Sequence, residues 1–238
     1  MTLHFAHAPA IWREFPELVP GVLVVRDIRP DVDVGDLLEP WHERARERLR
    51  QGPESELPEV AAWRRAFARM GLKPTQYRSA AEALLRRFRR EGGVPRLHPL
   101  VDLCNAVSLA FALPVAVFDV ARIDGYLEVR PATGAERHVG ARGEVESPEA
   151  GEVIFVDAAD HAHARRWTFR QSQDSTVRPD TRQALIVSEG LHATAPADVP
   201  ALLEALRRDI ATTWTAASGH AVLTAASPRL ELSVGPAR

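Results

Sequence analysis

The sequence predicts an α+β fold in which helices pack on a mixed, largely antiparallel sheet. Helical periodicity dominates residues 36–112, whereas short apolar runs separated by turns dominate from residue 126 onward. Helices that come mainly before the strands are typical of α+β proteins rather than of alternating α/β folds. With 238 residues, 45% of them hydrophobic, and a net charge of −2, the chain can bury a substantial core.

Composition also indicates the cellular compartment of the protein. No apolar run reaches the roughly 18 residues that a membrane-spanning helix needs, and the first 15 residues lack the basic start and apolar centre of a signal peptide. Cys104 is the one cysteine of the chain, which excludes an internal disulfide framework. We therefore expect a cytoplasmic protein without a membrane segment.

The N-terminal part, residues 1–60, is expected to form a strand and a helix that pack on a main domain of residues 61–238. Pro20 and Gly21 precede a short buried strand at Val22–Val25. A helical pattern follows over residues 36–51, and Pro40 within it predicts that the helix starts there, with proline in its first turn. Residues 52–59 read as a loop.

Three further helices are predicted before residue 115. The first spans residues 59–70 and ends at Gly71. Ser79 and Glu82 have the spacing of a capping box at the start of the second. The third runs from Pro99 to Ala112, and residues 115–119 then read as a strand.

The remaining elements are mainly strands. Residues 126–140 resemble a hairpin that turns at Thr133 and Gly134, and residues 151–157 resemble a further strand. A strand at residues 184–188 follows, and Asp198 is expected to cap an amphipathic helix that reaches about Trp214. Two short strands are expected near the C-terminus.

Charge is concentrated in residues 61–100. This segment holds ten basic and two acidic side chains, a local charge of +8 in a chain of net charge −2. Such asymmetry indicates a contact with a polyanion. A solvated, arginine-rich helix face is an equally good interpretation.

A polar stripe runs through the apolar helix predicted at residues 99–112. Asp102, Asn105 and Ser108 follow one another at intervals of three and therefore lie along one side of the helix. Such a stripe either satisfies local backbone groups or lines a pocket.

Common catalytic constellations are missing from the sequence. Cys104 lies in an apolar helix six residues after His98, where a cysteine is usually inert packing. His161 and His163 alternate as two metal ligands on a strand could, but no cysteine or carboxylate cluster accompanies them. No nucleophile elbow, P-loop or dinucleotide fingerprint occurs. We therefore expect no metal and no cofactor.

A dense polar run at residues 170–176 separates two apolar strands. It reads RQSQDST and contains no glycine, which indicates side chains fixed by packing rather than a flexible turn. A solvated hairpin loop is the alternative.

These motifs, in this order, resemble the B3/B4 domain, the editing domain of the β subunit of bacterial phenylalanyl-tRNA synthetase, which also occurs as free-standing proteins. The resemblance covers roughly residues 60–215 and includes Asn105, Pro114, Phe118 and Asp119. It implies a B3/B4-like fold, binding of tRNA and hydrolysis of a mischarged aminoacyl ester. Ala116 stands where the synthetase pattern has a histidine, and the run at 170–176 replaces a glycine-rich stretch with a glutamate. The resemblance therefore leaves the amino acid and the tRNA open.

From the resemblance and the polar run together we assign candidate roles. An aminoacyl ester is activated, so a site needs mainly to orient a water molecule and stabilise an oxyanion. The catalytic candidates are Asn105, Gln171 and Thr176, and the substrate-binding candidates are Ser108, Trp167, Arg170 and Ser175. The candidate tRNA-binding residues are Arg86, Arg87, Arg89 and Arg90. The alternatives are a non-catalytic module that binds tRNA or a small ligand in the same pocket, and a structural domain whose arginine face docks a protein.

Overall fold

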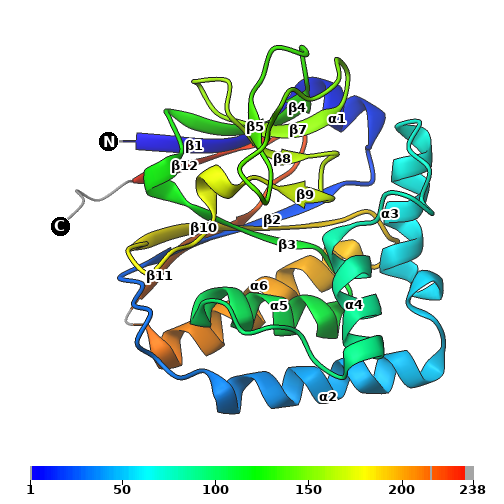
Figure 1. Cartoon of the computed structure of the whole chain (residues 1–238), viewed down its shortest axis with the longest axis vertical. Helices are drawn as coiled ribbons and strands as arrows, with labels where there is room; N and C mark the ends of the chain where they lie inside the picture. Colours follow the sequence, from blue (N-terminus) through cyan, green and yellow to red (C-terminus); the bar gives the residue numbers. More distant parts are fainter. Residues whose placement is uncertain (1, 215, 234–238) are drawn as a thin grey trace.

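Two β-sheets face each other in the computed structural model, which describes residues 2–214 and 216–233 (Figure 1). The larger sheet has the order β12-β1-β4-β7-β8-β9, from β1 (Thr2–His7), β4 (Tyr126–Pro131), β7 (Val153–Val156), β8 (Ala162–Arg165), β9 (Arg170–Gln171) and β12 (Arg229–Ser233). The smaller sheet has the order β11-β2-β10-β3, from β2 (Val19–Arg26), β3 (Val115–Asp119), β10 (Gln183–Gly190) and β11 (Ala216–Val222). A ribbon of β5 (His138–Val139) and β6 (Val145–Glu146) is separate.

The expected α+β class is confirmed. Among the strand pairs of the described residues, β1 and β4 run parallel and the other pairs run antiparallel, so the sheets are mixed and largely antiparallel. The helices are α1 (Pro9–Glu14), α2 (Gly35–Gln51), α3 (Pro58–Arg69), α4 (Ala80–Glu91), α5 (Pro99–Phe111) and α6 (Ala195–Thr213). Short 3₁₀ turns lie at η1 (Glu54–Glu56), η2 (Val120–Arg122) and η3 (Gln173–Ser175). Within the described residues, no helix combines the length and the apolar character that crossing a membrane requires.

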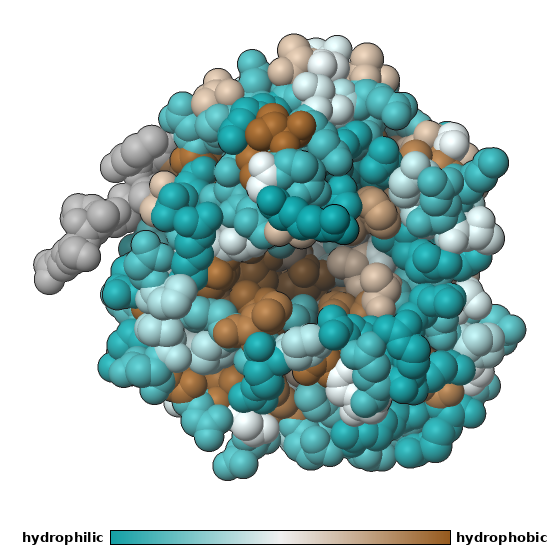
Figure 2. Space-filling view, in the orientation of Figure 1, coloured by the Kyte–Doolittle hydropathy of each residue, from teal (hydrophilic) through white to brown (hydrophobic). Residues whose placement is uncertain are grey.

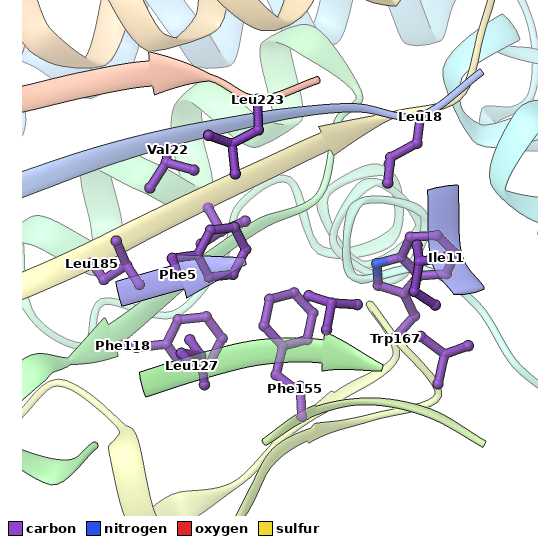
Figure 3. Close-up of a cluster of buried hydrophobic side chains, with 14 of the residues drawn as sticks. Phe5, Ile11, Leu18, Val22, Phe118, Leu127, Phe155, Trp167, Leu185 and Leu223 are labelled. Atoms are coloured by element: carbon purple, nitrogen blue, oxygen red, sulfur yellow. The ribbon is translucent and has the colours of Figure 1, made fainter. Parts of the chain in front are cut away.

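Two apolar layers hold these elements together. Between the sheets lie aromatic and aliphatic side chains such as Phe5, Phe118 and Phe155, with the rings of Phe118 and Phe155 5.4 Å apart (Figure 3). On the other face of the smaller sheet, Leu23 and Ile186 pack against α5 and α6 (Figure 1). Burial of both faces explains the continuous apolar runs at the centres of these strands, residues 22–25 in β2 and residues 184–187 in β10.

The N-terminal segment contributes to both sheets. β1 lies between β12 and β4 in the larger sheet, and β2 lies between β11 and β10 in the smaller one. Strands of the expected 1–60 and 61–238 segments therefore share hydrogen bonds in both sheets.

Several element boundaries differ from the expected ones. Helix α2 begins at Gly35, before Pro40, and α6 begins at Ala195, so Asp198 lies in its first turn rather than at its cap. The expected hairpin over residues 126–140 is wrong, because β4 pairs with β7 and β5 pairs with β6. The buried carboxylate of Glu136 accepts the backbone N–H groups of Thr133 and Gly134, which turns the chain away from β4.

Candidate functional site

The site lies where the edge strands of the two sheets meet. β3 ends the smaller sheet and β9 ends the larger one. Gln171 on β9 joins them, because its Nε2 donates to the carbonyl oxygen of Val117 on β3 over 2.8 Å. Two cavities adjoin at this junction and share Val115 and Gln171 in their walls. Figure 2 shows a hollow with a largely hydrophobic floor near the middle of the molecular face that it presents.

The larger cavity, which we call the groove, has a volume of about 480 Å³. Asn105, Gln171 and Thr176 line it, so the structure brings all three catalytic candidates together. The Thr176 hydroxyl donates to the carbonyl oxygen of Gln173 over 3.1 Å, which leaves its oxygen as an acceptor. Most of the remaining wall is apolar.

His98 also lines the groove, although its spacing from Cys104 is the only feature that draws attention to it in the sequence. Its side chain caps α5, because Nδ1 accepts the N–H of Leu100 over 3.2 Å. Nδ1 is thus the acceptor, and the proton of the neutral ring lies on Nε2. His98 is buried, and Nε2 has no partner among the described residues. Burial lowers the pKa of His98, against the field of Asp102, which raises it. Neutral His98 therefore holds an N–H that is buried within the wall of the groove and unpaired in the part of the chain that the structure describes.

The smaller cavity, of about 60 Å³, lies behind Gln171. Ala116, Ala164, Val187 and Trp167 are among its apolar walls, and Glu189 contributes a carboxylate. Trp167 is fully buried and, like Arg166 before it, has a positive φ, 59° against 46°. This conformation is unfavourable for a large side chain and is often retained at functional sites.

The substrate-binding candidates separate into two groups. Trp167 and Arg170 line the smaller cavity, and Arg170 is exposed, with Nη1 3.7 Å from a Glu146 carboxylate oxygen. Ser108 and Ser175 line neither cavity and are fully buried. The Ser108 hydroxyl donates to the carbonyl oxygen of Leu113 over 2.6 Å. The expectation that Ser108 projects into the pocket is therefore corrected, because the hydroxyl satisfies the backbone at the end of α5.

The polar stripe of α5 is thus divided by residue. Asn105 lines the groove. Asp102 accepts the backbone N–H of Leu97 over 2.8 Å and pairs with Arg96 over 3.1 Å, so it satisfies local groups. One side of the helix serves both purposes, because Asp102 and Ser108 satisfy backbone groups near the two ends of α5 and Asn105, between them, lines the groove.

Comparison with known proteins identifies the family. A model of the B3/4 domain matches residues 62–198, which is more than half of the chain. The chain belongs to the B3/4 domain family.

Relatives of this B3/4 domain protein include phenylalanine–tRNA ligase β subunits. That of Legionella pneumophila strain Paris is 42% identical over 48 residues, which are 20% of this chain and 6% of the relative. That of Shewanella oneidensis is 32% identical over 101 residues, which are 42% of this chain and 13% of the relative. The chain thus spans only a small part of these relatives.

A crystal structure of an N-terminal fragment of the phenylalanyl-tRNA synthetase β subunit from Pyrococcus horikoshii is also similar. The match covers 88% of this chain and 48% of that one, with a TM-score of 0.45 and 10% identity.

The basic face of this B3/4 domain protein lies toward the end of α4. Arg86 and Arg89 both pair with Glu54 over 3.3 Å, while Arg87 and Arg90 pair with Glu91 over 2.7 and 2.6 Å. Four cations against two carboxylates leave this group with a net charge of +2. All four arginine side chains are at least 40% exposed, so they remain accessible to an anion.

One cluster has the composition of a metal site. Glu59, His192 and Asp198 hold candidate ligand atoms within 4.8 Å of one another. However, Arg48 donates to both carboxylate oxygens of Glu59 over 2.7 Å, and His192 pairs with Asp198 over 2.9 Å. These contacts already occupy carboxylate oxygens that a metal would need.

Two other sequence candidates have structural roles. Cys104 is buried, and burial raises the pKa of its thiol, which suppresses the nucleophilic thiolate. His161 and His163 both approach the carboxylate of Asp157, over 3.6 and 3.1 Å. Asp157 lies six residues before His163 and is the carboxylate partner that inspection of the sequence missed.

Proposed function

We propose that the protein binds tRNA and hydrolyses the ester bond of mischarged aminoacyl-tRNA at the groove. The observation that carries the proposal is the convergence of Asn105, Gln171 and Thr176 on one groove, at the junction with a small apolar cavity. Membership of the B3/4 family and similarity to proteins named phenylalanine–tRNA ligase β subunits support tRNA as the partner.

The groove offers the chemistry that this reaction needs. The ammonium group beside the carbonyl activates an aminoacyl ester, so a positioned water molecule and donors for the developing oxyanion suffice. The amide of Asn105 is a donor of this kind, and His98 holds a buried Nε2–H, without a partner among the described residues, in the same wall. Gln171 uses one amide proton to hold Val117, which leaves the other for a ligand. Thr176, whose hydroxyl proton is committed to Gln173, can accept a hydrogen bond from water.

The position of α4 supports a path for the nucleic acid. Its first residue, Ala80, lies in the wall of the smaller cavity. Arg89 lies nine residues further along the helix, roughly 13 Å away at 1.5 Å per residue. A terminal nucleotide at the groove therefore leaves preceding phosphates within reach of this basic end.

The test is release of amino acid from a panel of tRNAs, each carrying a cognate or a non-cognate amino acid. We expect the purified protein to deacylate at least one mischarged tRNA. His98→Asn keeps a capping acceptor for α5 while it removes the distal N–H, and we expect it to slow hydrolysis by about 10²- to 10³-fold, as loss of one oxyanion donor does.

His42→Asn is the matched control, because His42 also has an Nε2 without a partner among the described residues but lies on α2 against Phe88. It should leave the rate unchanged. No hydrolysis of any member of the panel, together with retained tRNA binding, would replace the proposal with a non-catalytic binding module.

A further inference from the structure

The smaller cavity contains a buried carboxylate that the proposed hydrolysis does not use. Glu189 is 2% exposed and lies at the end of β10, among the apolar walls formed by Ala116, Ala164, Val187 and Trp167. A charged group in such surroundings is costly unless hydrogen bonds and an opposite charge compensate it.

Hydrogen bonds compensate Glu189 only in part. Oε1 accepts from His7 Nε2 over 2.6 Å and from Trp167 Nε1 over 3.0 Å. Oε2 accepts from the same Trp167 Nε1, also over 3.0 Å. Because a carboxylate can accept about four hydrogen bonds, Oε2 retains capacity for a further donor.

His7 approaches only one oxygen of this carboxylate. Its Nε2 lies 2.6 Å from Oε1, and His7 itself is buried. Among the described residues, Oε2 has only the Trp167 N–H, which it shares with Oε1. Oε2 therefore holds the unfilled acceptor positions of Glu189.

We propose that this cavity binds the ammonium group of a small amino acid, with Glu189 as its counterion. The inference rests on the proposed function, in which that amino acid is the aminoacyl group of the tRNA. An ammonium group places a positive charge beside the buried carboxylate and donates to Oε2. The adjoining junction places the ester carbonyl beside Gln171, between the cavity and the groove.

The volume of the cavity limits the amino acid. A buried water needs about 15 Å³ of such space, so a cavity of about 60 Å³ accepts about four groups of that size. Glycine, alanine and serine meet this limit, whereas the ring of tyrosine or phenylalanine exceeds it. The small side chain of Ala116 in this wall contributes to the available space.

Binding of amino-acid amides tests the assignment without tRNA or turnover. Alaninamide, N-acetylalaninamide and tyrosinamide are titrated into ¹⁵N-labelled protein, and the Trp167 indole N–H resonance, assigned with Trp167→Phe, is followed. We expect alaninamide to shift this resonance and to bind at least 10-fold more tightly than the other two. Equal binding of N-acetylalaninamide would refute the ammonium site, and stronger binding of tyrosinamide would refute the size limit.

Two variants separate charge from space. Glu189→Gln should weaken alaninamide at least 10-fold, while Glu136→Gln, which changes a buried carboxylate in a turn outside both cavities, should not. Ala116→Val keeps Glu189 but fills the cavity, and it should also weaken binding, so the test survives if Glu189→Gln fails to fold. Alaninamide binding that neither variant changes would overturn the assignment.

The assignment and the proposed function can fail separately. Amine binding that depends on Glu189, without deacylation of any aminoacyl-tRNA, refutes hydrolysis and supports the cavity assignment. Deacylation that is indifferent to Glu189→Gln and to Ala116→Val refutes the cavity assignment alone.

Discussion

Asp157 connects the strands of the larger sheet, and its neutralisation gives a quantitative test of the structure. Its carboxylate is fully buried. Oδ1 accepts the backbone N–H groups of Ala159 and His161 over 3.0 and 2.9 Å. Oδ2 accepts the N–H of Asp124 over 3.1 Å and lies 3.1 Å from His163 Nε2. The charged form is therefore surrounded by donors.

Burial by itself raises the pKa of Asp157, but the hydrogen bonds from His163, Asp124 and His161 outweigh it and lower the pKa to about 2. The ordinary pKa of an aspartate is 3.8, and each unit of pKa difference corresponds to about 1.36 kcal/mol. Ionisation of Asp157 therefore stabilises the fold by about 2 kcal/mol. Because the pKa in the folded state is the lower one, this stabilisation is complete well above pH 3.8 and is lost as the pH falls through 2. About half of it remains near pH 3.

The measurement is urea unfolding of the natural sequence and of Asp157→Asn at pH 7, 5, 4 and 3, followed by tryptophan fluorescence. At pH 7 the variant should lose at least about 2 kcal/mol of unfolding free energy, and the difference should shrink by about 1 kcal/mol at pH 3. Asp160→Asn, a change in the same turn at a side chain that is 68% exposed, is the control and should have little effect at any pH. A difference between Asp157→Asn and the natural sequence that does not vary with pH would refute the reasoning.

Four further predictions concern the site and its surroundings. Asn105→Ala and Gln171→Ala should each slow deacylation by about 10²- to 10³-fold, whereas Gln173→Ala, outside the walls of both cavities, should have little effect on the measured rate. Cys104→Ala should leave the deacylation rate unchanged, because burial raises the pKa of the thiol. A chelator should also leave the rate unchanged, and rapid-quench kinetics should show no burst of acyl-enzyme. Ser108→Ala should lower the unfolding free energy by about 1–3 kcal/mol without raising KM, because its hydroxyl satisfies a backbone carbonyl. A variant of α4 that carries glutamate in place of Arg86, Arg87, Arg89 and Arg90 should bind tRNA more weakly in a filter-binding assay. The slope of log Kd against log salt concentration should also fall by roughly 0.9 for each phosphate that the protein no longer neutralises.

Features that depend on near neighbours follow from the sequence without knowledge of the fold. Ser79 caps α4 by accepting the N–H of Glu82, as their spacing predicts, and Pro99 opens α5. The strand at Val22–Val25 lies within β2. β1 is not predicted from the sequence, because its alternation of buried Leu3 and Phe5 with half-buried His4 is too short to be decisive.

The composition of the site, in contrast, depends on long-range packing. Val117 and Gln171 are 54 residues apart and meet because two sheets place their edge strands together. His7 and Glu189, separated by 182 residues, meet across the core between the sheets. A glutamate directly after the apolar run at residues 184–187 and Ser188 is visible in the sequence, but its partners and the cavity beside it are not. Helical spacing likewise places Asn105 and Ser108 on one side of α5. Only the packing of β3 and of the loop after α5 decides that Asn105 lines a cavity and that Ser108 donates to a backbone carbonyl.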